Sequence, residues 1–157
     1  MPPVLPGEDE SALFRDTIGD TCKQKNPADD TSLNELDLMT PIQFENWVLR
    51  RLQANGYRAQ RTGQSRDGGA DGIAVHSLTG ELVIVQCKHR QGRYCDSEPI
   101  DDLLKARHVY GQADARLIAV TTAECYTAQA RERAARYGVE LVARELLLAF
   151  PLGNGTA

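Results

Sequence analysis

Three polar residues at the ends of two predicted strands have the types and spacing to hold a divalent cation. The apolar run ELVIVQCK ends in Gln86 and Lys88, which share one face because strand residues two apart point the same way. A turn at 77–80 would fold this strand back on an earlier one, expected over 70–76. Asp71, at the start of that earlier strand, would then lie beside Gln86 and Lys88.

A carboxylate, an amide oxygen and an ammonium group at one end of a sheet suit a magnesium ion that also contacts a phosphate. Mg²⁺ prefers oxygen ligands, with one or two carboxylates and water in the remaining positions. Asp71 would supply charge, the Gln86 side chain and the Cys87 backbone carbonyl would supply neutral oxygens, and Lys88 would hold or deprotonate the attacking water. The alternative is an Asp67-Gly68 turn followed by two solvated polar residues. Either feature alone, the Asp-Gly turn segment with Asp71 or the strand end with Gln86 and Lys88, favours that alternative. The two features together, at this spacing, favour the metal site.

The helix expected over 41–55 would carry a further carboxylate toward this site. Thr40 and Gln43 form a capping box around Pro41, and apolar residues follow at helical spacing. Glu45 lies at the border of the buried stripe, where a carboxylate is costly without a partner. A metal would be such a partner, but a first-turn Glu favoured by the helix dipole explains Glu45 equally well.

The remaining pattern predicts one α/β domain. Strands are expected at 57–61, 70–76 and 81–88, then a helix from about residue 100, the strand RLIAVTT, an Ala/Arg-rich helix ended by Gly138, the strand VELVA and a short final helix. This order predicts an α/β sandwich with an antiparallel meander and later strands joined through crossover helices. We expect residues 1–38 to be a largely irregular leader or linker, 39–150 the domain, and 151–157 a flexible tail.

Charge is unevenly distributed along the 157 residues. The net charge is −4, but residues 1–38 contain nine acidic and three basic residues, so the rest of the chain is mildly basic. Five arginines and no acid fall between Arg50 and Arg66, a patch that suits a phosphate backbone or simply a solvated surface. No apolar run is long enough to span a membrane and the N-terminus is acidic, so a cytoplasmic protein without a membrane partner is expected.

The four cysteines show no paired spacing and are expected to be reduced thiols. A zinc site from Cys87, His89 and Cys95 is conceivable, but structural zinc sites usually present paired ligands and a fourth ligand nearby. The sequence therefore favours magnesium over zinc.

Four segments, FENWVLRRLQANGY, DGGADGIAV, VIVQCK and LIAVTTAECYTAQARERAARYGVELV, resemble the Mrr-type restriction endonuclease domain, a branch of the PD-(D/E)xK nuclease superfamily. The resemblance covers residues 39 to about 150. It implies a restriction-endonuclease-like three-layer α/β/α sandwich with a central mixed sheet and an αβββαβαβ core. It also implies that Asp71 and Lys88 are catalytic, that Gln86 lies at the metal site, and that Glu45 completes it.

The expected activity is that of a Mg²⁺-dependent endodeoxyribonuclease, with Mn²⁺ as a substitute, that uses activated water in restriction, defence or DNA processing. Asp67 would support the turn or the metal's water shell. The residues expected to contact DNA are Arg61, Arg66, His89, Arg90 and Arg93. A Holliday-junction-resolvase-like nuclease and an inactive nucleic-acid-binding module of the same fold remain alternatives. A homodimer would supply the two sites that duplex cleavage needs, and the leader could connect to further domains or partner proteins.

Overall fold

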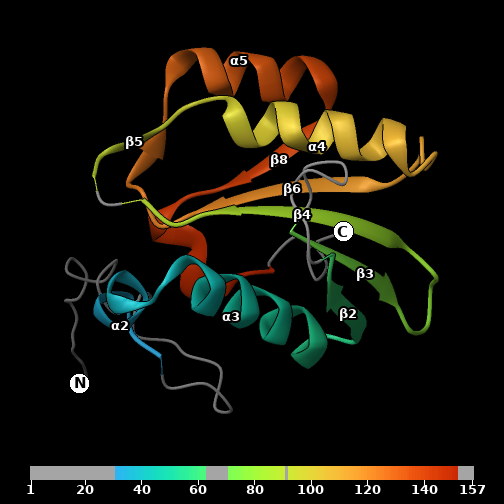
Figure 1. The fold of residues 1–157 in the computed structure, drawn as a ribbon, viewed down its shortest axis with the longest axis horizontal. Coiled ribbons are helices and arrows are strands. Elements are labelled where there is room, and N and C mark those ends of the chain that lie inside the picture. Colours follow the sequence, from blue (N-terminus) through green and yellow to red (C-terminus); the bar gives the residue numbers. More distant parts are fainter. Residues whose placement is uncertain (1–30, 63–70, 91, 152–157) are drawn as a thin grey trace, which may run out of the picture. The chain divides into compact units, whose positions relative to one another are not determined.

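The computed structural model describes residues 31–62, 71–90 and 92–151, and a five-stranded sheet forms its centre (Figure 1). The strand order is β2-β3-β4-β6-β8. The strands are β2 (Tyr57–Arg61), β3 (Gly72–His76), β4 (Leu82–Lys88), β6 (Arg116–Thr121) and β8 (Val139–Val142). No helix in these described ranges is long and apolar enough to cross a membrane.

The sheet is mixed, which confirms the prediction. Strands β2, β3 and β4 pair antiparallel, and β4, β6 and β8 pair parallel. In the β3–β4 pair Gly72 lies opposite Val85, so Asp71 is next to the segment that carries Gln86 and Lys88. Strand β4 is therefore central, with a hairpin partner on one side and a crossover partner on the other.

Helices cover both faces of this sheet, as the three-layer prediction requires. Helix α3 (Pro41–Ala54) lies on one face, whereas α4 (Glu98–Val109) and α5 (Ala128–Tyr137) lie on the other (Figure 1). Alternate residues of β4 point into separate cores, with Val83, Val85 and Cys87 on the α3 side and Ile84 on the α4 side. Gln86 and Lys88 follow Ile84 in this alternation, so they belong to the α4 face.

The start of α3 is fixed by the predicted capping box. The Thr40 hydroxyl accepts from the Gln43 N–H at 3.1 Å, and the Gln43 side chain accepts from the Thr40 N–H at 2.9 Å. Phe44, Trp47 and Val48 are fully or almost fully buried, which confirms the apolar stripe. Because the cap sets where the helix begins, it also sets where Glu45 projects.

A short helix, α2 (Leu33–Leu38), precedes α3 and lies on the leader side of the boundary expected at residue 39. Its own capping box joins Ser32 and Glu35, and Leu36 is fully buried in the core on the α3 side. Asp37 accepts two hydrogen bonds from Arg144, at 2.7 and 2.8 Å. The division of the chain at residue 39 stays a prediction.

Two further elements differ in kind from what the pattern indicated. The loop after β4 contains β5 (Tyr94–Cys95), which pairs parallel with β7 (Cys125–Tyr126). The expected final helix is a 3₁₀ helix, η2 (Arg144–Ala149). Both elements are short, and neither changes the order of the central sheet.

Gly72 allows α3 to pack closely against β3 beside Asp71. A Cβ atom at this position would lie 2.5 Å from Leu49 Cδ2 and 3.3 Å from Val85 Cγ1. We expect Gly72→Ala to lower the free energy of unfolding by about 2 kcal/mol, because overpacking forces buried neighbours to shift. Urea denaturation measures this, and adding Leu49→Ala should recover part of the loss when the double variant is compared with Leu49→Ala alone. Equal destabilisation in both backgrounds would show that Leu49 is not the obstacle.

Candidate active site

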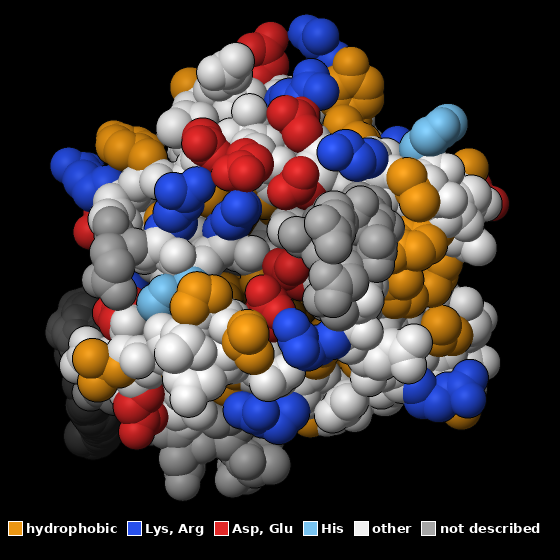
Figure 2. Space-filling view, in the orientation of Figure 1, with side chains coloured by type: hydrophobic (Ala, Val, Ile, Leu, Met, Phe, Trp, Pro, Cys, Tyr) orange, Lys and Arg blue, Asp and Glu red, His pale blue; other side chains and the backbone are white. Residues whose placement is uncertain are grey.

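A cavity of about 530 Å³ lies at the end of β4 that carries Gln86 and Lys88. All five positions predicted to take part in metal binding or catalysis line it, which brings α3, the start of β3 and β4 together. Its lining residues are Pro41, Glu45, Asp71, Gln86, Cys87, Lys88, His89, Arg90, Glu98, Asp102 and Lys105. Acidic and basic side chains lie intermixed on the face shown in Figure 2.

Asp71 is held rigidly by the backbone of β4. Its N–H donates to the Val85 carbonyl at 3.1 Å, and its Oδ2 accepts from the Cys87 N–H at 2.8 Å. Burial raises the pKa of this carboxyl to about 6; the Cys87 hydrogen bond opposes the shift, and the nearby charge of Glu45 adds to it. The site thus contains a fixed carboxylate whose charge is under-compensated.

This raised pKa predicts a pH-dependent stability for the metal-free protein. The folded carboxyl keeps its proton up to about pH 6, whereas an unfolded Asp loses it near a pKa of about 3.9. The folded state therefore binds more protons in that window, so stability should fall by roughly 2 kcal/mol as pH rises from about 4 to 6. Asp71→Asn should lack this step.

Urea midpoints of the wild type and Asp71→Asn at pH 4 and pH 7.5, both in EDTA, measure the effect. The Asn variant should be the more stable protein at pH 7.5, and its advantage should shrink at pH 4. A constant difference between the two proteins would contradict the pKa assignment, since only the difference isolates Asp71 from other titrating groups.

The side-chain oxygen of Gln86 is buried and has no hydrogen-bond partner in the part of the chain that the structure describes. The residue as a whole is only 4% exposed. An unpaired buried amide oxygen costs free energy that a ligand in the cavity would recover. A cation or a hydrogen-bond donor bound in the cavity would therefore be stabilised by Gln86 Oε1.

Lys88 is positioned by the neighbouring strand. The Thr121 hydroxyl donates to the Lys88 carbonyl at 2.8 Å, and the Thr122 N–H contacts the same carbonyl at 3.3 Å. The Lys88 ammonium lies 3.3 Å from Glu98 on α4. The backbone of Lys88 is therefore fixed, while its side chain is held by an ion pair.

Glu45 lies just after the first turn of α3, which contains no acidic residue, and it lines the same cavity while being mostly shielded from solvent. Its side chain is 16% exposed, and Oε1 lies 3.4 Å from Nε of Arg61 at the end of β2. Glu45 therefore already has a cationic neighbour, and Arg61 is an ion-pair partner of the candidate site.

The other residues expected to contact DNA have different environments. His89 Nε2 lies 2.7 Å from the Leu36 carbonyl, and its ring packs edge-on against Phe44, so its ring is occupied by the protein. Arg93 is 71% exposed and lies 3.5 Å from Glu124. Arg66 and Asp67 lie outside the described residues.

The predicted patch of five surface arginines is wrong for Arg51, which is buried. Arg51 is 6% exposed; its Nε donates to the Phe150 carbonyl at 2.9 Å and its Nη2 to the Leu148 carbonyl at 2.6 Å. Its guanidinium also lies 5.5 Å from the centre of the Trp47 ring. Arg51 therefore secures the C-terminal segment to α3 and is not a surface cation available to phosphate.

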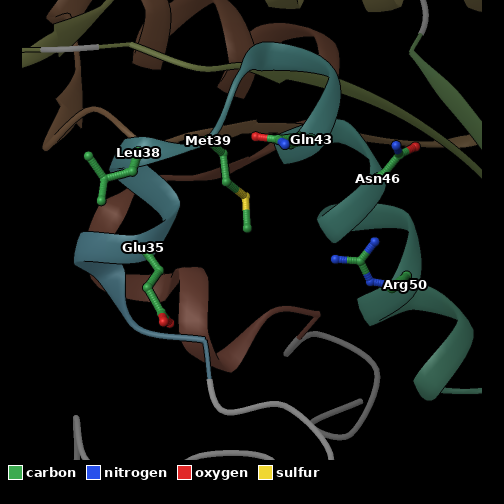
Figure 3. Close-up of a pocket in the computed structure, with 6 residues that line it drawn as sticks. All are labelled: Glu35, Leu38, Met39, Gln43, Asn46 and Arg50. Carbon is green, nitrogen blue, oxygen red and sulfur yellow. The ribbon is translucent and has the colours of Figure 1, made fainter.

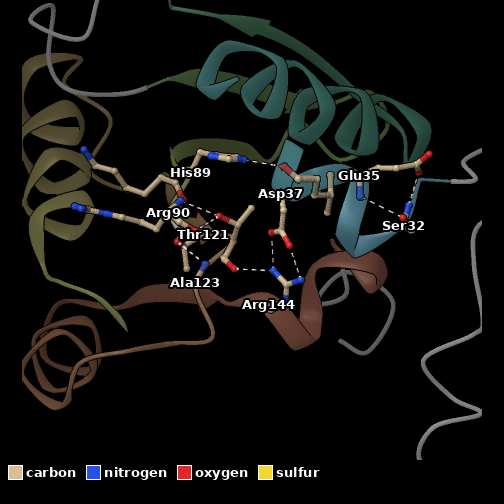
Figure 4. A network of polar contacts seen from close by, with 11 residues as sticks. Ser32, Glu35, Asp37, His89, Arg90, Thr121, Ala123 and Arg144 are labelled. Carbon is tan, nitrogen blue, oxygen red and sulfur yellow. Dashed lines mark hydrogen bonds and ion pairs between the residues drawn. The ribbon is translucent and has the colours of Figure 1, made fainter. Parts of the chain in front are cut away.

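Sequence reasoning missed several residues around the cavity. Thr122 exchanges hydrogen bonds with the Arg90 backbone at 2.8 and 2.9 Å, which continues the attachment of β6 to the segment after β4. Arg90 and Thr121, the residue before Thr122, lie close together in Figure 4. In the sequence, the feature that could have indicated this contact is the pair of Thr residues at the end of the apolar strand RLIAVTT. Glu98, Asp102 and Lys105 come from one face of α4, at i, i+4 and i+7 spacing. The sequence does not show that this face meets the cavity, because that depends on how α4 crosses the sheet.

A second pocket, of about 490 Å³, is separate from these residues. It lies between α2 and α3 and is lined by Glu35, Leu38, Met39, Gln43, Asn46 and Arg50 (Figure 3). None of the candidate catalytic residues lies in it.

The composition of the first cavity limits the kind of metal it suits. Across residues 31–62, 71–90 and 92–151 there is no group of three or more His, Cys, Asp or Glu side chains placed to hold a metal. Cys87 packs in the core on the α3 side and Cys95 in the core on the α4 side, and both are free thiols, which does not suit a zinc site that would need both with His89. Two carboxylates with an amide oxygen match the sparser protein ligand set of Mg²⁺.

The central mixed sheet with helices on both faces has the architecture of restriction-endonuclease-like folds. The restriction endonuclease family model Mrr_cat matches residues 36–150. The chain belongs to this family, which confirms the resemblance seen in the sequence.

Two solved structures with TM-scores above 0.5 agree with the fold, and the third, with a TM-score below 0.5, is given for its similarity alone. A protein of unknown function, AF1548, is 16% identical with a TM-score of 0.51, covering 69% of this chain and 58% of its own. A repair endonuclease from Pyrococcus abyssi is 18% identical with a TM-score of 0.51, covering 73% and 48%. The MspJI restriction endonuclease in complex with a 27-mer oligonucleotide is 25% identical with a TM-score of 0.46, covering 68% and 26%.

The chain thus spans about half the length, or less, of these solved proteins. No curated protein matches it.

Proposed function

We propose that this protein is a Mg²⁺-dependent endonuclease that hydrolyses DNA phosphodiester bonds with activated water. The observation that carries the proposal is the convergence of Asp71, Gln86 and Lys88 in one cavity, where the buried Gln86 amide oxygen has no partner among the residues that the structure describes. Membership of a restriction endonuclease family supports the same reaction class.

The residues fit a divalent cation chemically. Asp71 and Glu45 would provide two carboxylates, and Gln86 Oε1 and the Cys87 carbonyl would provide neutral oxygens. A cation there would also favour the charged form of Asp71, whose pKa burial raises to about 6. When bound, Mg²⁺ lowers the pKa of a coordinated water and offsets charge on the phosphate.

The chain's own groups would orient the reaction. Lys88 would hold the attacking water by hydrogen bonding and stabilise negative charge on the phosphate. Arg61, adjacent to Glu45, would keep that carboxylate in place before the cation binds. No protein nucleophile is required, so the reaction would proceed without a covalent enzyme intermediate.

DNA is the proposed substrate because the family is one of restriction endonucleases and because cationic side chains adjoin the cavity. Arg90 lines it, and Arg93 follows on an exposed position. Such contacts to phosphates carry little sequence information, so base or structure preference would have to come from elsewhere. A homodimer and a role of the leader in joining partners are part of the same proposal.

Supercoiled plasmid incubated with Mg²⁺, with Mn²⁺ or with EDTA tests the function. We expect nicking with either metal, none in EDTA, and loss of nicking in Lys88→Ala. A four-way junction compared with a linear duplex distinguishes a resolvase-like enzyme. DNA binding without nicking under any metal would instead identify an inactive binding module, and nicking that survives Lys88→Ala would point to another source of activity.

A further inference from the structure

We propose that Glu98 is a built-in substitute for a substrate phosphate, which occupies the anion site between Lys88 and Arg90 until DNA displaces it. This inference rests on the proposed function for the identity of the incoming anion. It adds to that function a side chain on α4, Glu98, that competes with the DNA phosphate for the same two cations.

Two cationic side chains, those of Lys88 and Arg90, lie close to the same carboxylate oxygen of Glu98. Glu98 Oε1 lies 3.3 Å from Lys88 Nζ and 3.6 Å from Arg90 Nη2. An oxygen held between an ammonium and a guanidinium is the arrangement that proteins use for phosphate as well as for carboxylate oxygens. The geometry of the two cations therefore suits either anion.

Glu98, which carries this oxygen, lines the cavity of the candidate active site. Lys88, Arg90 and Glu98 all line the cavity that contains Asp71 and Gln86. A phosphate that reaches Asp71 and Gln86 would meet the same two cations. Phosphate and Glu98 would then compete for them, since both carry negative charge at one place.

The Glu98 side chain can move away from Lys88 and Arg90. Its side chain is 56% exposed, whereas those of Lys88 and Arg90 are 25% and 40% exposed. Glu98 is also the first residue of α4, so its side chain can rotate into solvent without disturbing a buried contact. The backbones of Lys88 and Arg90 are held by Thr121 and Thr122, whereas Glu98 is the most exposed of the three side chains.

Glu98→Gln removes the charge and keeps the size of the side chain. Asp101→Asn is the matched control, because Asp101 is another first-turn acid of α4 that pairs with Arg133 and does not line the cavity. Both variants lose one charge and a similar interaction with the helix dipole. Only Glu98→Gln should remove the carboxylate that the two cations share; Arg90 would keep its ion pair with Asp96, at 3.8 Å.

The experiment measures inorganic phosphate by ³¹P NMR titration and a short linear duplex by fluorescence anisotropy, both in EDTA so that no cleavage occurs. We expect Glu98→Gln to bind each ligand about fivefold more tightly than the wild type, with Asp101→Asn unchanged. Adding Arg90→Ala to Glu98→Gln should remove the gain. Thermal melting of each variant confirms that it is folded.

Equal gains in Glu98→Gln and Asp101→Asn would overturn the inference, because the effect would then be one of net charge. Weaker binding by Glu98→Gln would also overturn it, since Glu98 would then help to place Lys88. A gain for inorganic phosphate with no duplex binding by any variant would support the anion site and contradict the proposed DNA substrate. Duplex binding that is the same in all variants would support the substrate and contradict the role of Glu98.

Discussion

Asp71→Asn should reduce Mg²⁺-dependent DNA cleavage by at least about 10³-fold, the largest effect expected of any single substitution in this protein. The carboxylate is fixed by the Cys87 N–H, and it lines the same cavity as Gln86, whose Oε1 has no hydrogen-bond partner among the described residues. Asn keeps the size and an acceptor oxygen but not the charge that would hold the cation. Single-turnover cleavage of plasmid DNA measures the loss.

Two comparisons separate this effect from a loss of structure. Asp114→Asn makes the same change at an exposed position outside the cavity, and it should leave the rate unchanged. In EDTA at pH 7.5 the Asp71→Asn protein should be at least as stable as the wild type, because the buried charge is gone. Cleavage by Asp71→Asn within tenfold of the wild-type rate would rule out Asp71 as a principal metal ligand.

Two adjacent arginines on α3 should lose very different amounts of stability on the same substitution. Arg51→Met should lower the free energy of unfolding by about 3 kcal/mol, because the carbonyls of Leu148 and Phe150 lose a charged donor in a buried place. Met fills much of the same volume, so the loss reports the hydrogen bonds more than a cavity. Arg50→Met, at an exposed position, should change stability by less than about 0.5 kcal/mol.

Urea denaturation of the two variants side by side measures this difference. If Arg51→Met cost no more than Arg50→Met, the buried environment of Arg51 would be wrong, and Arg51 would return to the set of surface cations. The comparison therefore tests the correction to the arginine patch directly.

The central sheet could be predicted because its strands carry strong local signals. Turn residues separate apolar runs, and the predicted strand over 57–61 coincides with β2. The two-residue strands β5 and β7 could not be predicted, because two residues carry no periodicity and their pairing joins distant parts of the chain. The helix α2 did have a signal, the Ser32–Glu35 capping box, but six residues are too few for a clear apolar stripe.

The candidate site was predictable where it depends on neighbouring strands and unpredictable where it depends on helix placement. The two-residue alternation of β4 and the turn before it were enough to place Asp71 near Gln86 and Lys88. Arg51 occurs at helical spacing from Phe44 and Val48, so its burial was readable from position but was obscured by its charge. Glu98 and Asp102 could not be foreseen, since the crossing of α4 over the sheet is a tertiary feature.

The central position of β4 also has a consequence for how the protein folds. Its pairing with β3 closes a short loop, whereas its pairing with β6 requires the intervening α4 segment to be ordered first. The register that brings Asp71 to Gln86 belongs to the fast, local half of the assembly. Fraying of the C-terminal strand during native-state fluctuations would therefore leave that register in place, and hydrogen exchange at Asp71 and Cys87 should be slower than at β8.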